Sequence, residues 1–259
     1  MISVKNKRIL LIGSSGVLGS EFVKALYENK ANLIMSDVNN LKFNKVIKKF
    51  PDIKYLFCNL SKESEIIKMV SNAVNFYNGI DGVIFNSAVT QESLVKKNTN
   101  NFPDFENYPL NLWKKSIDVN LTSAFLIARE CSKHLKKSNG SLVFVSSIYG
   151  IVGPDHSIYE NQKFKSIPAY SASKAGLIGL ARWLSTWYAK KNVRVNVVVP
   201  GGVFNNHNNR FKNIYSKKTI MNRMAKPDDL SGIILYLMSD TSSYVTGQNF
   251  IIDGGFTAW

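Results

Sequence analysis

The sequence predicts a single α/β domain with a doubly wound, seven-stranded parallel sheet. Three observations support this prediction: continuous apolar runs of strand length, stretches of helical periodicity between them, and regular alternation of the two along the chain. Strands of a parallel sheet covered by helices on both faces are buried completely, so they are apolar throughout. With 259 residues, 45% of them hydrophobic, the chain can form the core of one large domain, residues 1–259.

The predicted strands and helices follow one another in order. Strands are expected at residues 8–12, 32–36, 55–58, 82–86, 141–146, 194–199 and 249–252. Helices are expected near residues 17–29, 62–78, 111–137, 170–190 and 227–239. Segments near 90–110, 151–168 and 204–223 have the polar and proline-rich character of loops. Ligands of such sheets bind beyond the carboxyl ends of the strands, so we expect these loops to enclose a substrate, with 204–223 as a lid.

The composition excludes several classes of protein. No apolar run reaches the roughly 18 residues of a membrane span, and residues 1–7 lead directly into a strand, so we expect a soluble, cytoplasmic protein without membrane contact. The net charge of +15 comes from scattered lysines without interleaved aromatic residues, which argues against nucleic acid as a partner. A basic molecule would nevertheless attract anionic substrates.

Metal and disulfide chemistry are not expected. Cys58 and Cys131 lie in unrelated apolar segments without paired spacing, which is typical of packing residues. Asp155, His156 and Glu160 lack a known ligand spacing, and we predict no metal site. The other two histidines are expected at the surface; they are His134 and His207.

A glycine-rich turn lies between the first strand and the first helix. Small residues there allow the backbone to approach a pyrophosphate, whose charge the helix N-terminus stabilises. A tight strand-to-helix turn without a ligand is the alternative, but the position at the first βα turn favours a dinucleotide site. The candidate contacts are Gly13, Ser15, Gly16, Val17, Leu18 and Gly19.

Asp37 ends the second predicted strand, where a carboxylate can accept hydrogen bonds from an adenosine ribose diol. The same charge would repel the 2′-phosphate of NADP, and no Arg or Lys immediately follows Asp37. We therefore expect NAD as the cofactor, with NADP less favoured, and Val38 beside it as a contact. The alternative is that Asp37 caps a helix before Val38 and Asn39.

Tyr170 and Lys174 lie four residues apart at the start of a predicted helix. A nearby cation favours phenolate, so a tyrosine in such a cleft becomes a usable acid or base. A second pair with this spacing, Tyr159 and Lys163, lies in a polar stretch without a following apolar helix. The first pair is followed by a periodic apolar face that should be buried and should hold both side chains: Leu177, Leu180, Ala181, Leu184 and Trp187.

The whole chain resembles the short-chain dehydrogenase/reductase family of Rossmann-fold oxidoreductases. The resemblance rests on an ordered set of motifs: the glycine turn, Asn86-Ser87-Ala88, Asp118-Val119-Asn120, Val145-Ser146-Ser147, Tyr170 with Lys174, Pro200-Gly201 and Asp253-Gly254-Gly255. It implies that Tyr170 exchanges a proton with the substrate oxygen, that Ser147 binds the same oxygen, and that Lys174 lowers the pKa of Tyr170 and binds the nicotinamide ribose. Asn120 would hold a water that links Lys174 to solvent. Ser147 is preferred over Ser146 because Gly150 follows it at the family's usual offset.

The resemblance also implies further cofactor contacts and self-association. The contacts are Asn59, Leu60, Asn86, Ser87, Ala88, Tyr170, Lys174, Pro200, Gly201, Val203 and Asn205. The glycine spacing departs from the family's commonest one, and Val17, Ile12, Val89 and Asn205 replace its usual residues. A homotetramer or homodimer is implied, built through the 111–137 and 170–190 helices and the C-terminal region.

The distance from Ser147 to Tyr170 is longer than the family norm because of an insertion at residues 153–160. This insertion resembles a subgroup associated with bacterial surface-sugar and flagellin modification. Its polar residues Asp155, His156, Tyr159 and Glu160 suit a polyhydroxylated substrate. We therefore expect an NAD-dependent oxidoreductase that acts on a secondary alcohol or ketone of a sugar derivative. The alternatives are a 3-oxoacyl-thioester reductase using NADPH and a non-catalytic dinucleotide-binding sensor or assembly protein.

Overall fold

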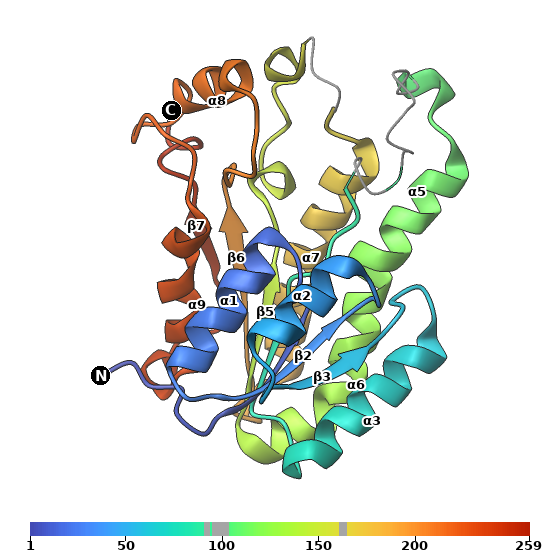
Figure 1. Cartoon of the computed structure of the whole chain (residues 1–259), viewed down its shortest axis with the longest axis vertical. Helices are drawn as coiled ribbons and strands as arrows, with labels where there is room; N and C mark the ends of the chain where they lie inside the picture. The colour runs from blue at the N-terminus through green and yellow to red at the C-terminus, as the bar shows by residue number, and fades with distance from the viewer. Residues whose placement is uncertain (91–93, 95–103, 161–164) are drawn as a thin grey trace.

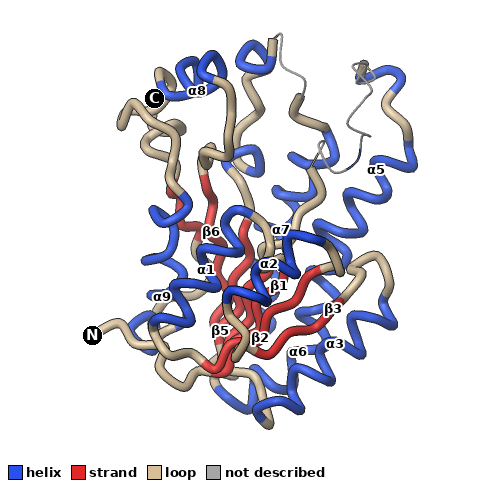
Figure 2. The backbone as a smooth tube through the Cα atoms, viewed as in Figure 1, coloured by secondary structure: helices blue, strands red, loops and turns tan. Residues whose placement is uncertain are grey.

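Seven parallel strands form one sheet in the order β3-β2-β1-β4-β5-β6-β7, as predicted (Figures 1 and 2). The computed structural model describes residues 1–90, 94, 104–160 and 165–259. The strands are β1 (Arg8–Ile12), β2 (Asn32–Asp37), β3 (Lys54–Phe57), β4 (Gly82–Phe85), β5 (Ser141–Val145), β6 (Arg194–Pro200) and β7 (Asn249–Ile252). The strand order reverses between β1 and β4, and such a switch point opens a crevice beyond the carboxyl ends of the strands.

Helices cover both faces of the sheet. One face packs against α1 (Val17–Glu28), α2 (Leu41–Lys49) and α9 (Ser231–Met238), and the other against α3 (Glu63–Tyr77), α6 (Ser123–Ser138) and α7 (Pro168–Trp187). Alternate residues of each strand enter opposite layers: Leu10 and Phe85 pack with the second group, and Leu11 and Ile84 with the first. This two-sided burial explains why the central strands are continuously apolar.

The structure corrects two predicted helices and contains a helix, α2, that was not predicted. Helix α2 was not predicted because it is rich in lysine and buries only Phe43; the Asn40 side chain caps it by accepting the Phe43 amide at 2.9 Å. The predicted helix at 111–137 is interrupted by a π-helical turn, Asp118–Thr122, between α5 (Leu110–Ile117) and α6. The segment 227–239 begins with the 3-10 turn Pro227–Leu230 and continues as α9.

The predicted loop at 204–223 contains a helix, α8 (Asn209–Ser216), which buries Phe211 and Tyr215. The prediction that Trp187 is buried is wrong, because its exposed fraction is 55%. Parts of the predicted loops 90–110 and 151–168 fall outside the described residues, as does Lys163 of the second tyrosine–lysine pair.

The described part of the chain contains no helix long and apolar enough to cross a membrane. The same part has no group of three or more His, Cys, Asp and Glu residues arranged to hold a metal ion. Cys58 and Cys131 are buried as free thiols, and burial raises the pKa of each to about 12. Both cysteines are therefore packing residues, protonated at neutral pH.

Candidate active site

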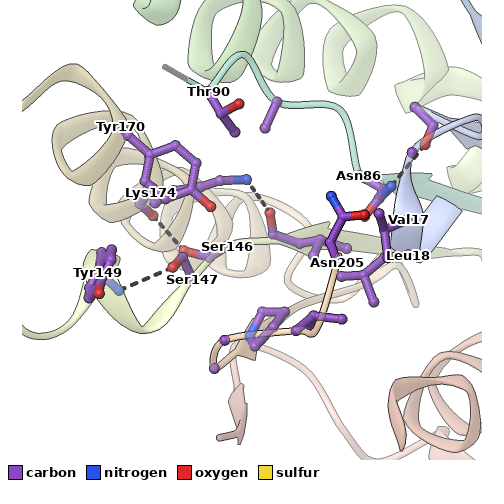
Figure 3. A pocket seen from close by; sticks show the side chains of 18 of the residues that line it. Val17, Leu18, Asn86, Thr90, Ser146, Ser147, Tyr149, Tyr170, Lys174 and Asn205 are labelled. Atoms are coloured by element: carbon purple, nitrogen blue, oxygen red, sulfur yellow. Dashed lines mark hydrogen bonds between the residues drawn. The ribbon is translucent and has the colours of Figure 1, made fainter. Parts of the chain in front are cut away.

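A pocket of about 600 Å³ lies at the carboxyl ends of the central strands. Most of the predicted site residues line it: Gly13, Ser15, Gly16, Val17, Leu18, Asp37, Asn86, Ser87, Ala88, Ser147, Tyr170, Lys174, Pro200, Gly201, Val203 and Asn205. Five others do not line it: Gly19, Val38, Asn59, Leu60 and Asn120. Figure 3 shows Tyr170, Lys174 and Ser147 together on one side of the pocket and Val17, Leu18 and Asn86 on the other.

The three glycines of the first turn differ in whether the surrounding fold leaves room for a side chain. Gly13 has a φ of 79°, and an added Cβ would lie 2.6 Å from the Ser87 nitrogen. An added Cβ at Gly19 would lie 2.0 Å from the Gly13 oxygen, so both positions need glycine for packing. At Gly16 the nearest neighbour of such a Cβ is 3.9 Å away. The fold does not require glycine there, and its missing side chain leaves the mouth of the turn open for a pyrophosphate at the start of α1.

Asp37, at the end of β2, is held by hydrogen bonds to the glycine turn. Its Oδ2 accepts hydrogen bonds from the Ser15 amide at 2.8 Å and the Ser15 hydroxyl at 2.7 Å, and its Oδ1 accepts from the Val38 amide at 2.8 Å. The carboxylate therefore has a fixed orientation at the edge of the pocket. Val38 contributes its amide to this arrangement without lining the pocket.

Asn59 and Leu60, which were expected to face the adenine, lie outside the pocket lining. The Asn59 side chain accepts the Ser61 amide at 3.1 Å, while the Asn59 amide donates to Glu65 at 2.8 Å. Leu60 is buried in the core beside α3. In this structure the two residues shape the loop after β3, and Asn40 and Lys42 line the pocket near its α2 side.

Two asparagines join the segments around the pocket. The Asn86 side chain donates to the Gly13 oxygen at 2.8 Å and so ties the end of β4 to the glycine turn. Asn120 lies fully buried in the π-helical turn, a feature that often occurs at functional sites. Its Oδ1 accepts the Val89 amide at 2.6 Å, and its Nδ2 donates to the Val89 oxygen at 3.2 Å and the Ser173 hydroxyl at 3.1 Å. Asn120 thus links three segments behind the pocket instead of lining it.

Ser147, Tyr170 and Lys174 converge at the far end of the pocket. Tyr170 forms a hydrogen bond with Ser147, and the Lys174 Nζ lies 5.5 Å from the Tyr170 ring centroid and donates to the Val145 oxygen at 2.7 Å. The neighbouring Ser146 hydroxyl instead donates to the Lys174 backbone oxygen at 2.8 Å. This difference agrees with the expectation that Ser147 faces Tyr170 and Ser146 is a structural neighbour.

Burial dominates the electrostatics of this group. It lowers the pKa of Lys174 to about 7, and it raises the pKa of Tyr170, with the Ser147 hydrogen bond acting in the opposite direction. The lowering of the Tyr170 pKa by Lys174, which the resemblance implies, stays a prediction; in this structure the burial of Tyr170 is the largest influence on its pKa. Lys174 can accordingly exchange a proton near neutral pH.

Several residues line the pocket that the sequence did not identify. The most prominent are aromatic: Tyr149, Phe211 and Tyr215; His207, and Tyr159 of the polar insertion, line the pocket too. His207, which was expected at the surface, is half-buried, and its ring stacks on Phe211 at a centroid distance of 4.8 Å. Tyr149 follows Ser147 by two residues, and this proximity was the available signal. Of the polar insertion, only Tyr159 lines the pocket; Asp155 forms an ion pair with Lys218.

Comparisons with known proteins agree with this geometry. A family model described as enoyl-(acyl carrier protein) reductase matches residues 13–257. Among curated proteins, the chain is 29% identical to post-translational flagellin modification protein A of Campylobacter coli, covering 98% of this chain and 99% of the relative. It is 28% identical to a 3-oxoacyl-[acyl-carrier-protein] reductase of Rickettsia felis, covering 98% of each chain. It is also 28% identical to the ribulose-forming D-arabinitol 2-dehydrogenase of Candida tropicalis, covering 98% and 93%.

A solved structure shares the fold at similar identity. The short-chain dehydrogenase of Leptospira borgpetersenii, which contains bound NAD+, superimposes with a TM-score of 0.86 and 30% identity, covering 98% of this chain and 94% of the other. The family match covers most of the chain, and the sheet order and pocket agree with it. The chain therefore belongs to the short-chain dehydrogenase/reductase family, as an NAD(P)-dependent oxidoreductase that acts on CH–OH groups.

Proposed function

We propose that the chain is an NAD-dependent oxidoreductase that interconverts a secondary alcohol and a ketone in a sugar derivative, in surface-glycan biosynthesis. One observation carries this proposal: a single pocket has a fixed carboxylate, Asp37, at one end and the Ser147, Tyr170 and Lys174 group at the other. The flagellin modification protein and the arabinitol dehydrogenase among the relatives support a sugar-like substrate. The free, buried cysteines support a cytoplasmic location.

In this proposal the glycine turn holds the pyrophosphate and Asp37 holds the adenosine ribose, while Val17, Asn86 and Asn205 border the rest of the cofactor. The nicotinamide supplies the hydride acceptor or donor. Tyr170 transfers the proton at the substrate oxygen, and Ser147 donates a hydrogen bond to that same oxygen as its negative charge develops.

Lys174 and Asn120 support this proton transfer. With its pKa lowered to about 7, Lys174 can relay a proton at neutral pH from within the buried site. Asn120 fixes Val89 and the start of α7 through its three hydrogen bonds, which positions Tyr170 and Lys174. We assign Asn120 as a positioning residue in this structure; its role in holding a water remains a prediction.

The experiment that tests the function is NADH formation by the purified protein. NAD and NADP are supplied in parallel with sugar phosphates, nucleotide sugars and free polyols, and acetoacetyl-CoA with NADH or NADPH is the reverse-direction probe. We expect turnover with NAD on a hydroxylated substrate. Exclusive turnover of acetoacetyl-CoA would contradict the sugar assignment.

A 3-oxoacyl-thioester reductase using NADPH is the second candidate. The description of the matching family model and the reductase of Rickettsia felis favour it. Lys42 also lines the pocket, where a cation could interact with the 2′-phosphate of NADPH. The polar and aromatic lining around Tyr149 and Tyr159 suits an extended acyl chain less well than a polar substrate.

We expect Asp37→Asn to lower the preference for NAD over NADP by about 10–100-fold in the ratio of the two kcat/KM values, since each factor of ten corresponds to about 1.4 kcal/mol. The substitution keeps the shape of the side chain and removes the charge that repels the 2′-phosphate. Steady-state kinetics with both cofactors measure the ratio. Asp52→Asn removes the same charge from an exposed position outside the pocket and is the control. An unchanged ratio in Asp37→Asn would refute the role of Asp37.

We further propose a homotetramer or homodimer that buries the outer face of α7. Trp183 and Trp187 stack on each other at 5.3 Å on this face although they are 58% and 55% exposed, and Phe125 of α6 is 47% exposed. We expect Trp183→Glu to lower the mass measured by light scattering, because a charge would be buried at the interface. Tyr244→Glu changes another exposed aromatic residue and should leave the mass unchanged. A wild-type monomer at micromolar concentration would contradict the proposal.

A further inference from the structure

Two tyrosines that line the pocket, and do not belong to the expected catalytic group, form a hydrogen bond between their hydroxyls. Tyr149 comes from the 3-10 turn Ile148–Gly150 and Tyr159 from the 3-10 turn His156–Tyr159, and both line the pocket. Their hydroxyl oxygens are 2.8 Å apart, a normal hydrogen-bond distance. The short loop that follows Ser147 and the insertion that lengthens the distance to Tyr170 thus meet at one hydrogen bond.

Neighbouring rings fix the position of this pair. Tyr159 packs against Phe211 of α8 at 5.7 Å, Phe211 against Tyr215 at 6.0 Å, and Tyr215 against Phe256 at 5.1 Å. The Tyr149 amide donates to the Ser147 hydroxyl at 3.2 Å, so the backbone carrying Tyr149 is tied to the residue that faces Tyr170 (Figure 3). The hydroxyl pair therefore has a defined place beside the reacting group.

Both phenols are neutral hydrogen-bonding groups at physiological pH. Burial raises the pKa of Tyr149 far above its ordinary value and that of Tyr159 to about 12. Negative charge on Tyr170 would act in the same direction on both pKa values. The pair thus acts by donating and accepting hydrogen bonds and not as a second base.

One of the two hydroxyl protons of the pair remains available to donate a hydrogen bond to a ligand. When Tyr159 donates to Tyr149, the Tyr149 hydroxyl proton is still available, and among the described residues it makes no hydrogen bond of its own. A buried hydroxyl without an acceptor is costly, and a ligand oxygen would satisfy it. An apolar chain offers no acceptor for this hydroxyl proton, so this wall of the pocket favours an oxygen-bearing substrate.

We propose that the Tyr149 and Tyr159 hydroxyls form a specificity-determining subsite that binds a substrate hydroxyl on the carbon next to the one that exchanges hydride. The inference deepens the proposed function and rests on it. The proposed function puts the reacting oxygen between Ser147 and Tyr170. Since the Tyr149 amide is bonded to the Ser147 hydroxyl and Tyr149 lines the same pocket, we assign the oxygen bound by Tyr149 to the adjacent carbon. The preferred substrate class is then vicinal diols and the corresponding α-hydroxyketones.

The test compares two alcohols that differ in this hydroxyl alone, butane-2,3-diol and butan-2-ol, as substrates with NAD. We expect the wild-type enzyme to prefer the diol. Tyr149→Phe should lower kcat/KM for the diol about 10–100-fold and change that for butan-2-ol less than about 3-fold, because only the diol loses a partner. Tyr159→Phe should have a smaller effect of the same kind, and the double variant should be no worse than Tyr149→Phe, because the two hydroxyls act as one unit.

The control is Tyr188→Phe, which removes the hydroxyl of another buried tyrosine that hydrogen-bonds Ser132 and does not line the pocket. It should leave the ratio of the two activities unchanged. Equal losses on both alcohols in Tyr149→Phe, or no loss on either, would overturn the subsite while leaving the proposed function intact. Absence of NAD-linked turnover by the wild-type enzyme on both alcohols and on D-arabinitol would overturn the proposed function, and the subsite with it.

Discussion

The Tyr170→Phe variant is expected to lose about 10²–10⁴-fold in kcat, the range typical of removing a general acid or base. The phenylalanine ring preserves the packing of Tyr170 and removes only the hydroxyl that bonds Ser147 and exchanges the substrate proton. NAD affinity, measured by quenching of protein fluorescence, should change little, because the Tyr170 ring stays in place and Asp37 and the glycine turn are untouched. Single-turnover kinetics then assign the loss to the chemical step.

This variant also separates an enzyme from a dinucleotide sensor on the same fold. A sensor needs the cofactor pocket but not the proton of Tyr170, so the variant would keep full cellular function. Ser147→Ala serves as the companion substitution, since it removes the other hydrogen bond to the substrate oxygen and should lower kcat less than Tyr170→Phe. If Tyr170→Phe turned over at the wild-type rate, the proposed proton transfer would be wrong.

The central strands were predictable because their physical signal is strong. Burial of nearly every position makes β1, β4, β5 and β6 predominantly apolar, and the alternation with helices favours the parallel arrangement. Helices α2 and α8 lacked such a signal, since each buries only a few aromatic or small residues behind a polar surface. Their starts were marked only by Asn40 and Asn208, which cap them through the amides three residues ahead.

The site was predictable to the extent that short local motifs define it. Ser147, Tyr170 and Lys174 were identified from spacing and resemblance, and the structure brings them together. Tyr149 carried no motif, and Tyr159 was expected only as one polar residue of the insertion. Their hydrogen bond could not be predicted, because it depends on how two loops fold over the sheet. The raised pKa of Tyr170 and the lowered pKa of Lys174 could not be predicted from the sequence either, since both follow from the depth of burial.

The burial of Lys174 in the site is expected to lower the stability of the folded protein. Its side chain is 2% exposed, its Nζ donates to the Val145 oxygen, and among the described residues no carboxylate forms an ion pair with it. A buried cation without a counter-charge is unfavourable, and the lowered pKa of about 7 is the measure of that penalty. Methionine has a similar unbranched shape and carries no charge.

We therefore expect Lys174→Met to abolish turnover and to change the pH dependence of stability. Between about pH 7 and pH 10.5 the unfolded wild-type chain binds a proton at Lys174 that the folded chain does not, so wild-type stability rises with pH in this window. The gain is at most about 1.4 kcal/mol per pH unit. Below pH 7 both states bind the proton and the full penalty remains. Stability of the variant relative to the wild type should thus be greatest at pH 6–7 and decline toward pH 9.5.

Thermal unfolding at pH 6.5, 8 and 9.5 measures this difference, with each kcal/mol corresponding to about 2–4 °C in Tm for a chain of this size. Measurements stop at pH 9.5 because Tyr170, whose pKa is raised from 10, contributes only at higher pH. Lys191→Met is the control, since it makes the same substitution at an exposed lysine outside the pocket. A constant difference for Lys174→Met across the window would show that Lys174 keeps its charge in the folded protein, and Tyr170 would then lie beside a permanent cation instead of a group that can pass on a proton.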